Sequence, residues 1–214
     1  MISIHGMARR GELTLTFDLD LGAGVSYAAG PNGSGKTTLL RVIAGLEALD
    51  EGELRIGDAL VDAPALGVFV PAHDRPVSLA FQDHRLFPHL SVIDNVAFPA
   101  RRRGVARTDA RADAAEYLDA VGMGTLANRR PRELSIGQQQ RTALARALAT
   151  PAAVLLLDEP LASIDEASRA SIRDRLRSSG HDTTVWVSHD PDDVAPASPL
   201  ISLVDGSVRQ TLVS

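Results

Sequence analysis

Apolar and polar residues alternate strictly between positions 13 and 21, with leucine or phenylalanine at every odd position and threonine or aspartate at every even one. Successive side chains of a strand point to opposite faces, so this pattern predicts a half-exposed strand in an antiparallel pairing. Gly22 and Gly24 then mark a turn. The apolar segment 25–29 that follows predicts a short buried strand.

A helical pattern begins near Lys36, where apolar residues recur at the spacing of one helix face. The segments 53–61 and 77–81 continue the predicted sheet. The helix is expected to point four side chains into the core, namely Leu39, Leu40, Ile43 and Ala44.

Three segments near the end of the chain predict further strands. The uninterrupted apolar run 154–157 is typical of a parallel strand whose two faces are both covered by helices. Residues 183–187 predict another strand. Residues 200–212 predict a hairpin that turns at Asp205 and Gly206.

Between the two groups of strands the pattern becomes helical. Thr108 is predicted to cap a helix that runs to Val121, and Gly122 is predicted to end it. A second helix is expected from residue 135 to residue 149. We therefore expect an α/β protein in which residues 1–82 and 151–214 form a core and residues 83–150 form a helical subdomain, with a boundary near Gln82.

Composition narrows the function classes. The chain has 214 residues, enough for one domain with a subdomain, and a formal net charge of −5. This charge argues against broad electrostatic attraction to nucleic acid or anionic lipid. The absence of cysteine excludes disulfides and thiolate metal sites. Met1 to Leu15 lacks the apolar core of a signal peptide, and no apolar stretch approaches the ~20 residues of a membrane-spanning helix, so any membrane role is expected to be peripheral.

A phosphate-binding loop is predicted between the strand at 25–29 and the helix at Lys36, because the sequence fits the pattern G-x-x-x-x-G-K-[ST] in the required context. In such a loop, backbone N–H groups wrap the phosphates and the helix N-terminus favours negative charge. Lys36, the only lysine in the chain, would reach the β- and γ-phosphates, and the Thr37 hydroxyl would bind Mg²⁺. The loop residues are Gly30, Pro31, Asn32, Gly33, Ser34, Gly35, Lys36 and Thr37.

Polar residues follow three of the predicted strands. Asp158 and Glu159 come after the apolar run, where open α/β sheets place their ligand sites. Asp158 would hold Mg²⁺ through its water shell, and Glu159 would polarise the attacking water as general base. His189 would hydrogen-bond the γ-phosphate, and the Gln82 amide would contact Mg²⁺ or the water. The acidic pair, taken alone, is equally compatible with a solvated turn after a strand. His189 alone is more typical of a structural or surface histidine, and Gln82 alone indicates nothing.

The order of these elements, together with a signature segment and Asp165, resembles the ABC ATPase family across nearly the whole chain. The signature segment is Leu134-Ser135-Ile136-Gly137-Gln138. The resemblance implies a P-loop NTPase (RecA-like) core with an N-terminal antiparallel β element and an inserted α-helical subdomain. It also implies that Thr38, Ser135, Gly137, Gln138 and Asp165 contact the nucleotide.

The family resemblance further implies ATP and Mg²⁺ as cofactors, a homodimer formed with ATP, and an integral membrane permease as partner. Two domains would pack head to tail, with each ATP between the phosphate loop of one and the signature helix of the other. Ser135 would open that helix and give an anion site at its N-terminus, although an ordinary serine cap explains the same residue. The expected location is the cytoplasmic face of the membrane, without direct contact to nucleic acid.

Two positions depart from the family pattern. Ile136 stands where the signature usually has glycine, which could alter its fit. Many members stack an aromatic side chain on adenine from the early segment, where this chain offers Arg9 and Arg10. A planar guanidinium can take the same stacking role.

The segment 81–92 looks like the corresponding stretch in importers of molybdate and related oxyanions, which suggests this cargo. The alternatives are an ABC ATPase of another importer or of an exporter, a soluble ABC ATPase that acts on nucleic acid or ribosomes, and a nucleotide-binding regulator without turnover. The net negative charge argues against the nucleic-acid alternative. Intact Lys36, Asp158, Glu159 and His189 argue against the regulator.

Overall fold

The computed structural model describes residues 1–195 and 198–212. The chain divides into two compact units. The second unit begins at Ala80, close to the boundary expected near Gln82. Residues 159–180 group with the helical unit in the structure, whereas the sequence analysis placed them in the core. The functional division into 1–82 with 151–214 and 83–150 stays a prediction. The first unit comprises Met1–Leu79, Ala152–Asp158 and His181–Ser214, and the second comprises Ala80–Pro151 and Glu159–Gly180.

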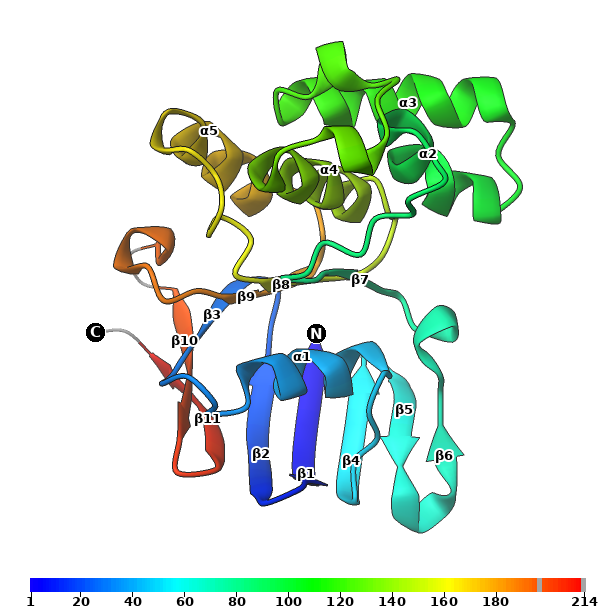
Figure 1. The fold of residues 1–214 in the computed structure, drawn as a ribbon. Helices are drawn as coiled ribbons and strands as arrows, with labels where there is room; N and C mark the ends of the chain where they lie inside the picture. Colours follow the sequence, from blue (N-terminus) through cyan, green and yellow to red (C-terminus); the bar gives the residue numbers. More distant parts are fainter. Residues whose placement is uncertain (196–197, 213–214) are drawn as a thin grey trace. The chain divides into compact units, whose positions relative to one another are not determined.

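The described residues form one eleven-stranded sheet, in the order β6-β5-β4-β1-β2-β11-β10-β3-β9-β8-β7 (Figure 1). Its first five strands along the chain are β1 (Ile2–Arg10), β2 (Leu13–Leu21), β3 (Gly24–Ala29), β4 (Glu51–Ile56) and β5 (Ala59–Ala63). The others are β6 (Val68–Phe69), β7 (Val77–Ala80), β8 (Val154–Asp158), β9 (Thr183–Val187), β10 (Pro199–Val204) and β11 (Ser207–Leu212).

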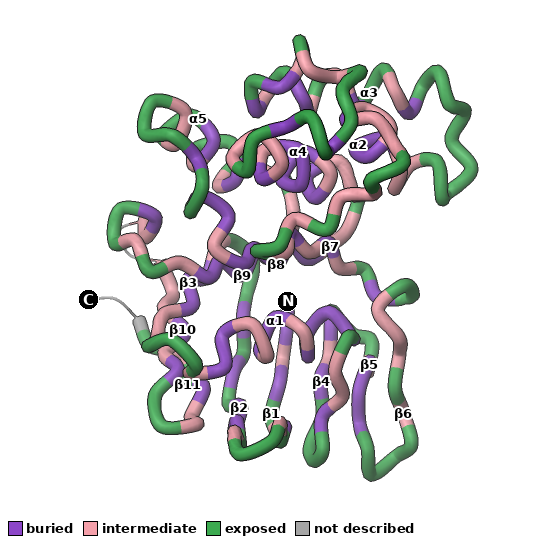
Figure 2. The backbone as a smooth tube through the Cα atoms, viewed as in Figure 1, coloured by how far each residue is buried: buried purple, intermediate pink, exposed green. Residues whose placement is uncertain are grey.

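The β6-β5-β4-β1-β2 part of the sheet is antiparallel throughout. This confirms the predicted N-terminal antiparallel element. Along β2, Leu15, Phe17, Leu19 and Leu21 are buried, and the threonines and aspartates of the strand are exposed. Figure 2 shows this alternation of buried and exposed residues along β2. The period-two alternation of apolar residues therefore places one face of this strand in the core.

The other part of the sheet holds four adjacent parallel strands, β10, β3, β9 and β8. Strand β3 pairs in parallel with β10 and with β9, and β9 pairs in parallel with β8. Every residue of β8 and β9 is buried, as expected for such strands. Helix α1 (Lys36–Ala44) packs against β8 and β9, and its four predicted core residues are buried. The β10–β11 hairpin turns through Asp205 and Gly206, whose φ angles of 48° and 77° fit the predicted two-residue turn.

The second unit is built around helices α2 (Val92–Arg102), α3 (Arg107–Ala120) and α4 (Ile136–Leu148), which pack against one another. Val92, Val96, Leu118, Met123 and Ala145 belong to their shared apolar core. Helix α5 (Glu166–Arg177) completes this unit. Short 3-10 turns lie at Pro64–Leu66, Ala72–Asp74, Gly124–Leu126, Pro131–Glu133 and Pro191–Asp193.

The start of α3 differs from the prediction. Thr108 does not cap this helix, which begins one residue earlier at Arg107 with Ala106 in the cap position. The Thr108 hydroxyl instead lies 3.0 Å from a carboxylate oxygen of Asp109, its neighbour in the first turn. The end is as predicted within one residue, since Gly122, with φ 69°, follows the last helical residues. No helix in the described ranges 1–195 and 198–212 is long and apolar enough to cross a membrane.

Candidate nucleotide site

The phosphate loop joins β3 to α1, the context that the sequence predicted. Its last residue before the helix, Gly35, is the N-cap of α1 and has a φ of 99°, in the left-handed region that side chains with a Cβ rarely adopt. A Cβ at this position would also lie 2.6 Å from Leu15 Cδ1. Glycine is therefore required here both by the turn of the chain and by the neighbouring strand.

Lys36 lies across the loop rather than pointing to solvent. Its ammonium donates to the carbonyl oxygens of Gly30 at 2.7 Å and Pro31 at 2.9 Å, and the side chain is largely buried. Ser34 Oγ in the same loop is buried and has no hydrogen-bond partner among the described residues. A buried hydroxyl and an ammonium in one glycine-rich loop before a helix N-terminus suit an anionic ligand such as phosphate.

Thr37 and Asp158 bring two oxygen groups together at the carboxyl edge of the parallel strands. Thr37 Oγ1 donates to Asp158 Oδ2 at 3.0 Å, and Asp158, at the end of β8, is only 6% exposed. Mg²⁺ prefers hard oxygen ligands and is commonly held by one or two protein groups together with substrate phosphates. This donor pair beside the phosphate loop fits such an ion. In residues 1–195 and 198–212, no group of three or more histidine, cysteine or acidic residues could hold a metal.

His189 follows β9, the strand between β3 and β8. Parallel strands end at the same edge of a sheet, so this residue, the phosphate loop and Asp158 all belong to that edge of the first unit. His189 is exposed, and the turn after it is held by Ser188, whose hydroxyl accepts the Asp190 N–H at 3.0 Å. The predicted contact of His189 with a γ-phosphate stays a prediction.

The two remaining catalytic candidates belong to the second unit. Gln82 lies exposed in the turn after β7. Glu159 directly follows Asp158 in the chain and has a φ of 47°, a left-handed value that is uncommon for a residue with a side chain. No local pattern predicts this backbone conformation, and the roles assigned to the two side chains stay predictions.

The signature segment begins helix α4 as predicted. Ser135 is the N-cap: its Oγ accepts the Gln138 N–H at 3.3 Å, and Gln138 Oε1 accepts the Ser135 N–H at 3.0 Å. This reciprocal capping box satisfies two helix N–H groups. Ile136 is the first helical residue and is 67% exposed, so its apolar side chain stands in solvent at the helix N-terminus.

Asp165 also caps a helix. Its Oδ1 accepts the Ser168 N–H at 3.0 Å at the start of α5, and Arg141 of α4 lies 3.9 Å from its other oxygen. The Ser168 hydrogen bond and the Arg141 charge hold the pKa of Asp165 below its ordinary value. The carboxylate is therefore ionised and engaged within the chain, and a nucleotide contact by Asp165 stays a prediction.

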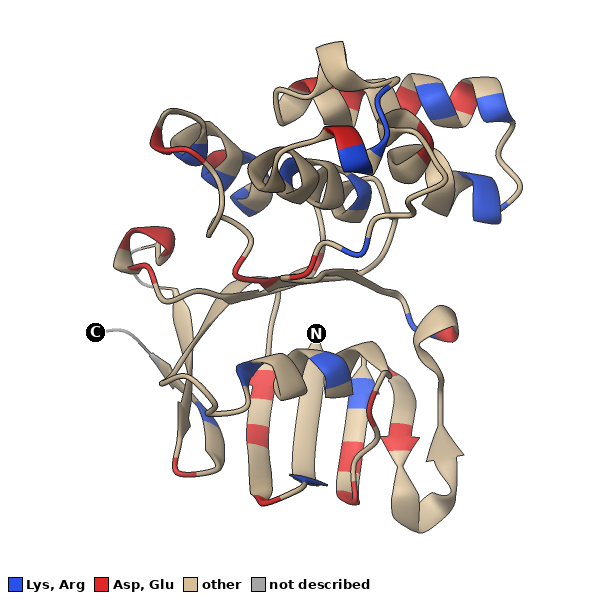
Figure 3. Cartoon of the chain, in the orientation of Figure 1, with Lys and Arg blue, Asp and Glu red and all other residues tan. Residues whose placement is uncertain are grey.

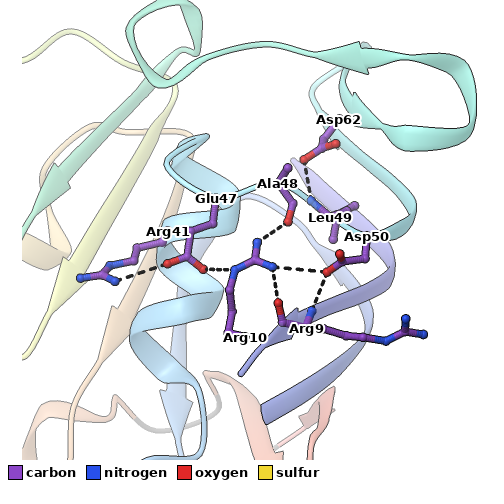
Figure 4. Close-up of polar contacts among 8 residues, drawn as sticks. All are labelled: Arg9, Arg10, Arg41, Glu47, Ala48, Leu49, Asp50 and Asp62. Atoms are coloured by element: carbon purple, nitrogen blue, oxygen red, sulfur yellow. Dashed lines mark hydrogen bonds and ion pairs between the residues drawn. The ribbon is translucent and has the colours of Figure 1, made fainter. Parts of the chain in front are cut away.

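The two arginines proposed for the base already have polar partners, and Figure 4 shows those of the Arg10 guanidinium. Arg10 Nε donates to Glu47 at 2.7 Å, Nη1 donates to Asp50 at 3.3 Å, and Nη2 donates to the carbonyl of Ala48. Arg9 Nη2 donates to Glu51 at 3.2 Å. The N–H groups of the Arg10 guanidinium are thus held by residues of the loop after α1. Stacking of adenine on the flat face of this group stays a prediction.

Gln140 was not among the predicted site residues. It is buried on α4 and hydrogen-bonds the segment that begins with Glu159. One signal was present: Gln140 lies three residues after Gly137, so both occupy the same face of the predicted helix. The partner of that face lies elsewhere in the sequence and cannot be found from the spacing.

A phosphate loop between a parallel strand and a helix, with an acidic residue at the end of a nearby parallel strand, defines the P-loop NTPase fold, as the sequence predicted. Within that class the chain belongs to the ABC transporter family, whose model matches residues 15–162.

Relatives of known name agree with this membership. The molybdenum import ATP-binding protein ModC of Mycobacterium tuberculosis is 46% identical over 93% of this chain and 56% of its own length. The trehalose/maltose import ATP-binding protein MalK of Thermococcus litoralis is 42% identical over 86% of this chain and 50% of its own length. The chain thus spans about half the length of the curated relatives it matches.

A solved structure agrees with the fold along the whole chain. The dimeric post-hydrolysis state of the ATP-binding cassette MJ0796, bound to ADP and Pi, superposes with a TM-score of 0.83 at 29% identity. The match covers 99% of this chain and 98% of the other. Because the coverage is nearly complete, the likeness includes both the sheet and the helical segments.

Proposed function

We propose that this chain is the ATP-binding and hydrolysing subunit of an ABC transporter, which couples ATP-driven dimer closure to translocation by a separate permease. The observation that carries the proposal is the hydrogen bond between Thr37 and Asp158 beside the phosphate loop, with Lys36 held in the same loop. The names of the two relatives reported above, both import ATP-binding proteins, support it.

The first unit binds the triphosphate in this proposal. The backbone N–H groups of residues 32–38 surround the phosphates, and Lys36 moves from the carbonyls of Gly30 and Pro31 to the β- and γ-phosphates. The hydroxyl of Thr37, the carboxylate of Asp158 and the amide of Gln82 hold Mg²⁺. When bound, Mg²⁺ neutralises the charge of the phosphates during transfer.

Hydrolysis requires a water aimed at the γ-phosphate. Glu159 accepts a proton from this water as general base, and His189 donates a hydrogen bond to the γ-phosphate. Gln82 orients the water through its amide. Each of these groups follows a strand of the sheet, where α/β proteins place their ligand sites.

A second copy of the chain completes each site. Ser135, Gly137 and Gln138 at the N-terminus of α4, with Asp165, face the nucleotide of the partner copy, since a helix N-terminus favours an anion. The permease is an integral membrane protein, and the chain sits on it at the cytoplasmic face. The dimeric state of the ATP-binding cassette MJ0796 supports this arrangement.

The cargo is molybdate or a related oxyanion. The 46% identity to a molybdenum import ATP-binding protein over 93% of the chain supports this assignment, and the 42% identity to a trehalose/maltose import protein makes a sugar the competing cargo. Uptake of labelled molybdate and of labelled maltose into vesicles, with the permease that co-purifies with the chain, separates the two.

The deciding experiment is light scattering of Glu159→Gln with and without Mg-ATP. Blocking the general base traps the ATP-bridged dimer, so the mass is expected to double when Mg-ATP is added. Lys36→Met in the same background removes the phosphate contact and keeps the chain monomeric. A Glu159→Gln variant that hydrolyses ATP at the unmodified rate contradicts the mechanism.

A further inference from the structure

Gln140 joins helix α4 to the segment that begins with the proposed general base. Its Nε2 donates to the carbonyl of Glu159 at 2.9 Å, and its Oε1 accepts the Ser163 N–H at 2.8 Å. The residue is 4% exposed. Both ends of one buried amide therefore hold the backbone of residues 159–163 at two points.

The backbone that Gln140 holds is in an unfavourable conformation. Glu159 has a φ of 47°, in the left-handed region that is sparsely populated by residues with a Cβ. Such a conformation persists only where the surroundings determine it. Besides the Gln140 amide, the Glu159 carbonyl accepts the N–H of Ala162 at 3.3 Å within the same turn.

The close approach of α4 to this segment depends on a neighbouring glycine. A Cβ at Gly137 would lie 2.5 Å from the carbonyl oxygen of Ser163, so only glycine permits the contact. Gly137 and Gln140 are three residues apart and share one face of α4. Farther along the same segments, Arg141 lies 3.9 Å from Asp165. One face of α4 thus contacts residues 159–165 at several points.

We propose that Gln140 is a positioning residue for hydrolysis: it fixes the left-handed backbone of Glu159 and thereby the direction of the carboxylate that activates water. The inference rests on the proposed function, in which Glu159 is the general base. In this inference, the signature helix α4 positions the general base Glu159 of its own chain. The N-terminus of the same helix contacts the nucleotide of the partner copy. Because Gln140 acts through Glu159, it affects turnover rather than ATP binding.

The test compares Gln140→Met with Gln139→Met in steady-state hydrolysis and nucleotide binding. Methionine is similar in size but makes neither hydrogen bond. Gln139 precedes Gln140 on the same helix, and its side-chain amide donates to the Leu134 carbonyl at 3.2 Å, away from residues 159–163. We expect Gln140→Met to lower kcat by up to about 100-fold, the loss that a misplacement of about 1 Å can cause, with an unchanged Kd for ATP. Gln139→Met is expected to keep both values.

Gln140→Glu serves as a second variant should methionine prevent folding. Its carboxylate still accepts the Ser163 N–H but cannot donate to the Glu159 carbonyl, so the same fall in kcat is expected. Each Gln140 variant is also combined with Glu159→Gln. If Gln140 acts through Glu159, the double variant is no slower than Glu159→Gln alone.

The outcomes separate the inference from the proposed function. Losses that multiply in the double variant, a weaker Kd in step with kcat, or an unchanged kcat in both Gln140 variants overturn the positioning role. If the unmodified chain lacks Mg-ATP hydrolysis, or if Glu159→Gln leaves it unchanged, the proposed function fails instead. A normal Glu159→Gln loss together with unchanged Gln140 variants overturns the inference alone.

Discussion

Thr37 and Asp158 are 121 positions apart in the sequence and meet through a 3.0 Å hydrogen bond, which links the first turn of α1 to the end of β8. Strand β8 is buried along its whole length and α1 packs against it. The position of the hydroxyl relative to the carboxylate is therefore set by the core and not by a mobile loop. A site built on rigid elements holds its ligands with little reorganisation.

Asp158→Asn is expected to weaken the binding of the Mg²⁺ that hydrolysis requires. The amide keeps the shape of the carboxylate and accepts the Thr37 hydrogen bond, but it lacks the charge that holds the hydrated ion. Loss of a partner of this kind costs about 10- to 100-fold in metal affinity or activity. Titration of Mg²⁺ at constant ATP measures the effect as a higher half-saturating concentration.

Thr37→Ser and Thr37→Val provide the matched pair for this prediction. Serine retains the hydroxyl and is expected to behave like the unmodified chain, whereas valine removes the oxygen at nearly constant volume. Equal Mg²⁺ dependence of the serine and valine variants would show that the hydroxyl does not contribute to the ion site.

Local sequence patterns predicted those elements whose conformation is determined by residues close to them in the sequence. The alternation along β2 and the cap at Ser135 both depend on neighbours in the sequence, and both are confirmed. Strand β1 was not predicted, because Gly6 interrupts its short apolar alternation. That glycine is explained by the facing strand, since Gly6 is opposite Gly52 and a Cβ there would lie 2.1 Å from the Glu51 carbonyl.

For the helical segments and the site, too, local patterns predict only what nearby residues determine. Helix α5 was not predicted because, of its described side chains, only Ile172 and Leu176 are buried, which is too few for an apolar face. The phosphate loop is contiguous and was recognised from spacing. Gln140 and the left-handed Glu159 depend on contacts between segments distant in the sequence, so no local pattern predicts them.

Arg75 is expected to be a major determinant of stability. Its buried guanidinium donates to the carbonyls of Val42 at 2.8 Å and Ile43 at 3.1 Å near the end of α1, and to Val70 at 2.7 Å, and it lies 3.8 Å from buried Asp62. Arg75→Met leaves that acid without its cation. Removal of one partner of a buried ion pair costs about 3–5 kcal/mol, measurable by urea unfolding.

The pH dependence of Arg75→Met identifies the cause of the loss. Burial raises the pKa of Asp62, and the Leu49 N–H and Arg75 oppose this shift. Without Arg75 the folded-state pKa rises further above the unfolded value, so the native state binds the extra proton and stability falls as pH rises through this range. Arg55→Met, at an exposed position, is the control with little expected effect. Asp62→Asn in the Arg75→Met background should recover part of the loss.

His5 on β1 is expected to titrate above its ordinary value of 6.5. Partial burial lowers the pKa of His5, but hydrogen bonds to Asp20 at 3.3 Å and Asp18 at 3.0 Å on β2 outweigh it. Figure 3 shows acidic residues along β2 and β4. A proton titration by NMR measures the shift, and Asp18→Asn or Asp20→Asn is expected to reduce it.

The sign of the stability effect follows from the raised pKa of His5. The charged ring is favoured in the folded state, so its contribution is complete below pH 6.5 and is lost as pH rises through the folded-state pKa. The ion pairs of His5 with Asp18 and Asp20 are partly exposed, which limits their contribution to stability to less than about 1 kcal/mol. His5→Gln should remove this pH dependence, and an identical profile in that variant would exclude the ion pair as its source.

Ser135 is the N-cap of α4, and in the proposed function it also contacts the nucleotide of the partner copy. Two substitutions separate these roles. Ser135→Ala removes the side chain that accepts the Gln138 N–H, which should cost about 1 kcal/mol of stability. Ser135→Asp keeps a good N-cap but places a negative charge at the proposed phosphate position. The aspartate variant should therefore fold normally and fail to form the ATP-bridged dimer in the Glu159→Gln background.

Ser91 supplies the matched control, because its Oγ accepts the Asp94 N–H at 3.2 Å as the N-cap of α2. Ser91→Ala and Ser135→Ala should lower the melting temperature by similar amounts. Dimer formation with Mg-ATP is then compared between the two by light scattering. If both alanine variants, and Ser135→Asp as well, form the dimer like the parent, Ser135 is only a helix cap and the signature segment does not bind the partner's nucleotide through it. If only the Ser135 variants fail, the loss comes from the anion site, since the matched loss of a cap elsewhere leaves the dimer intact.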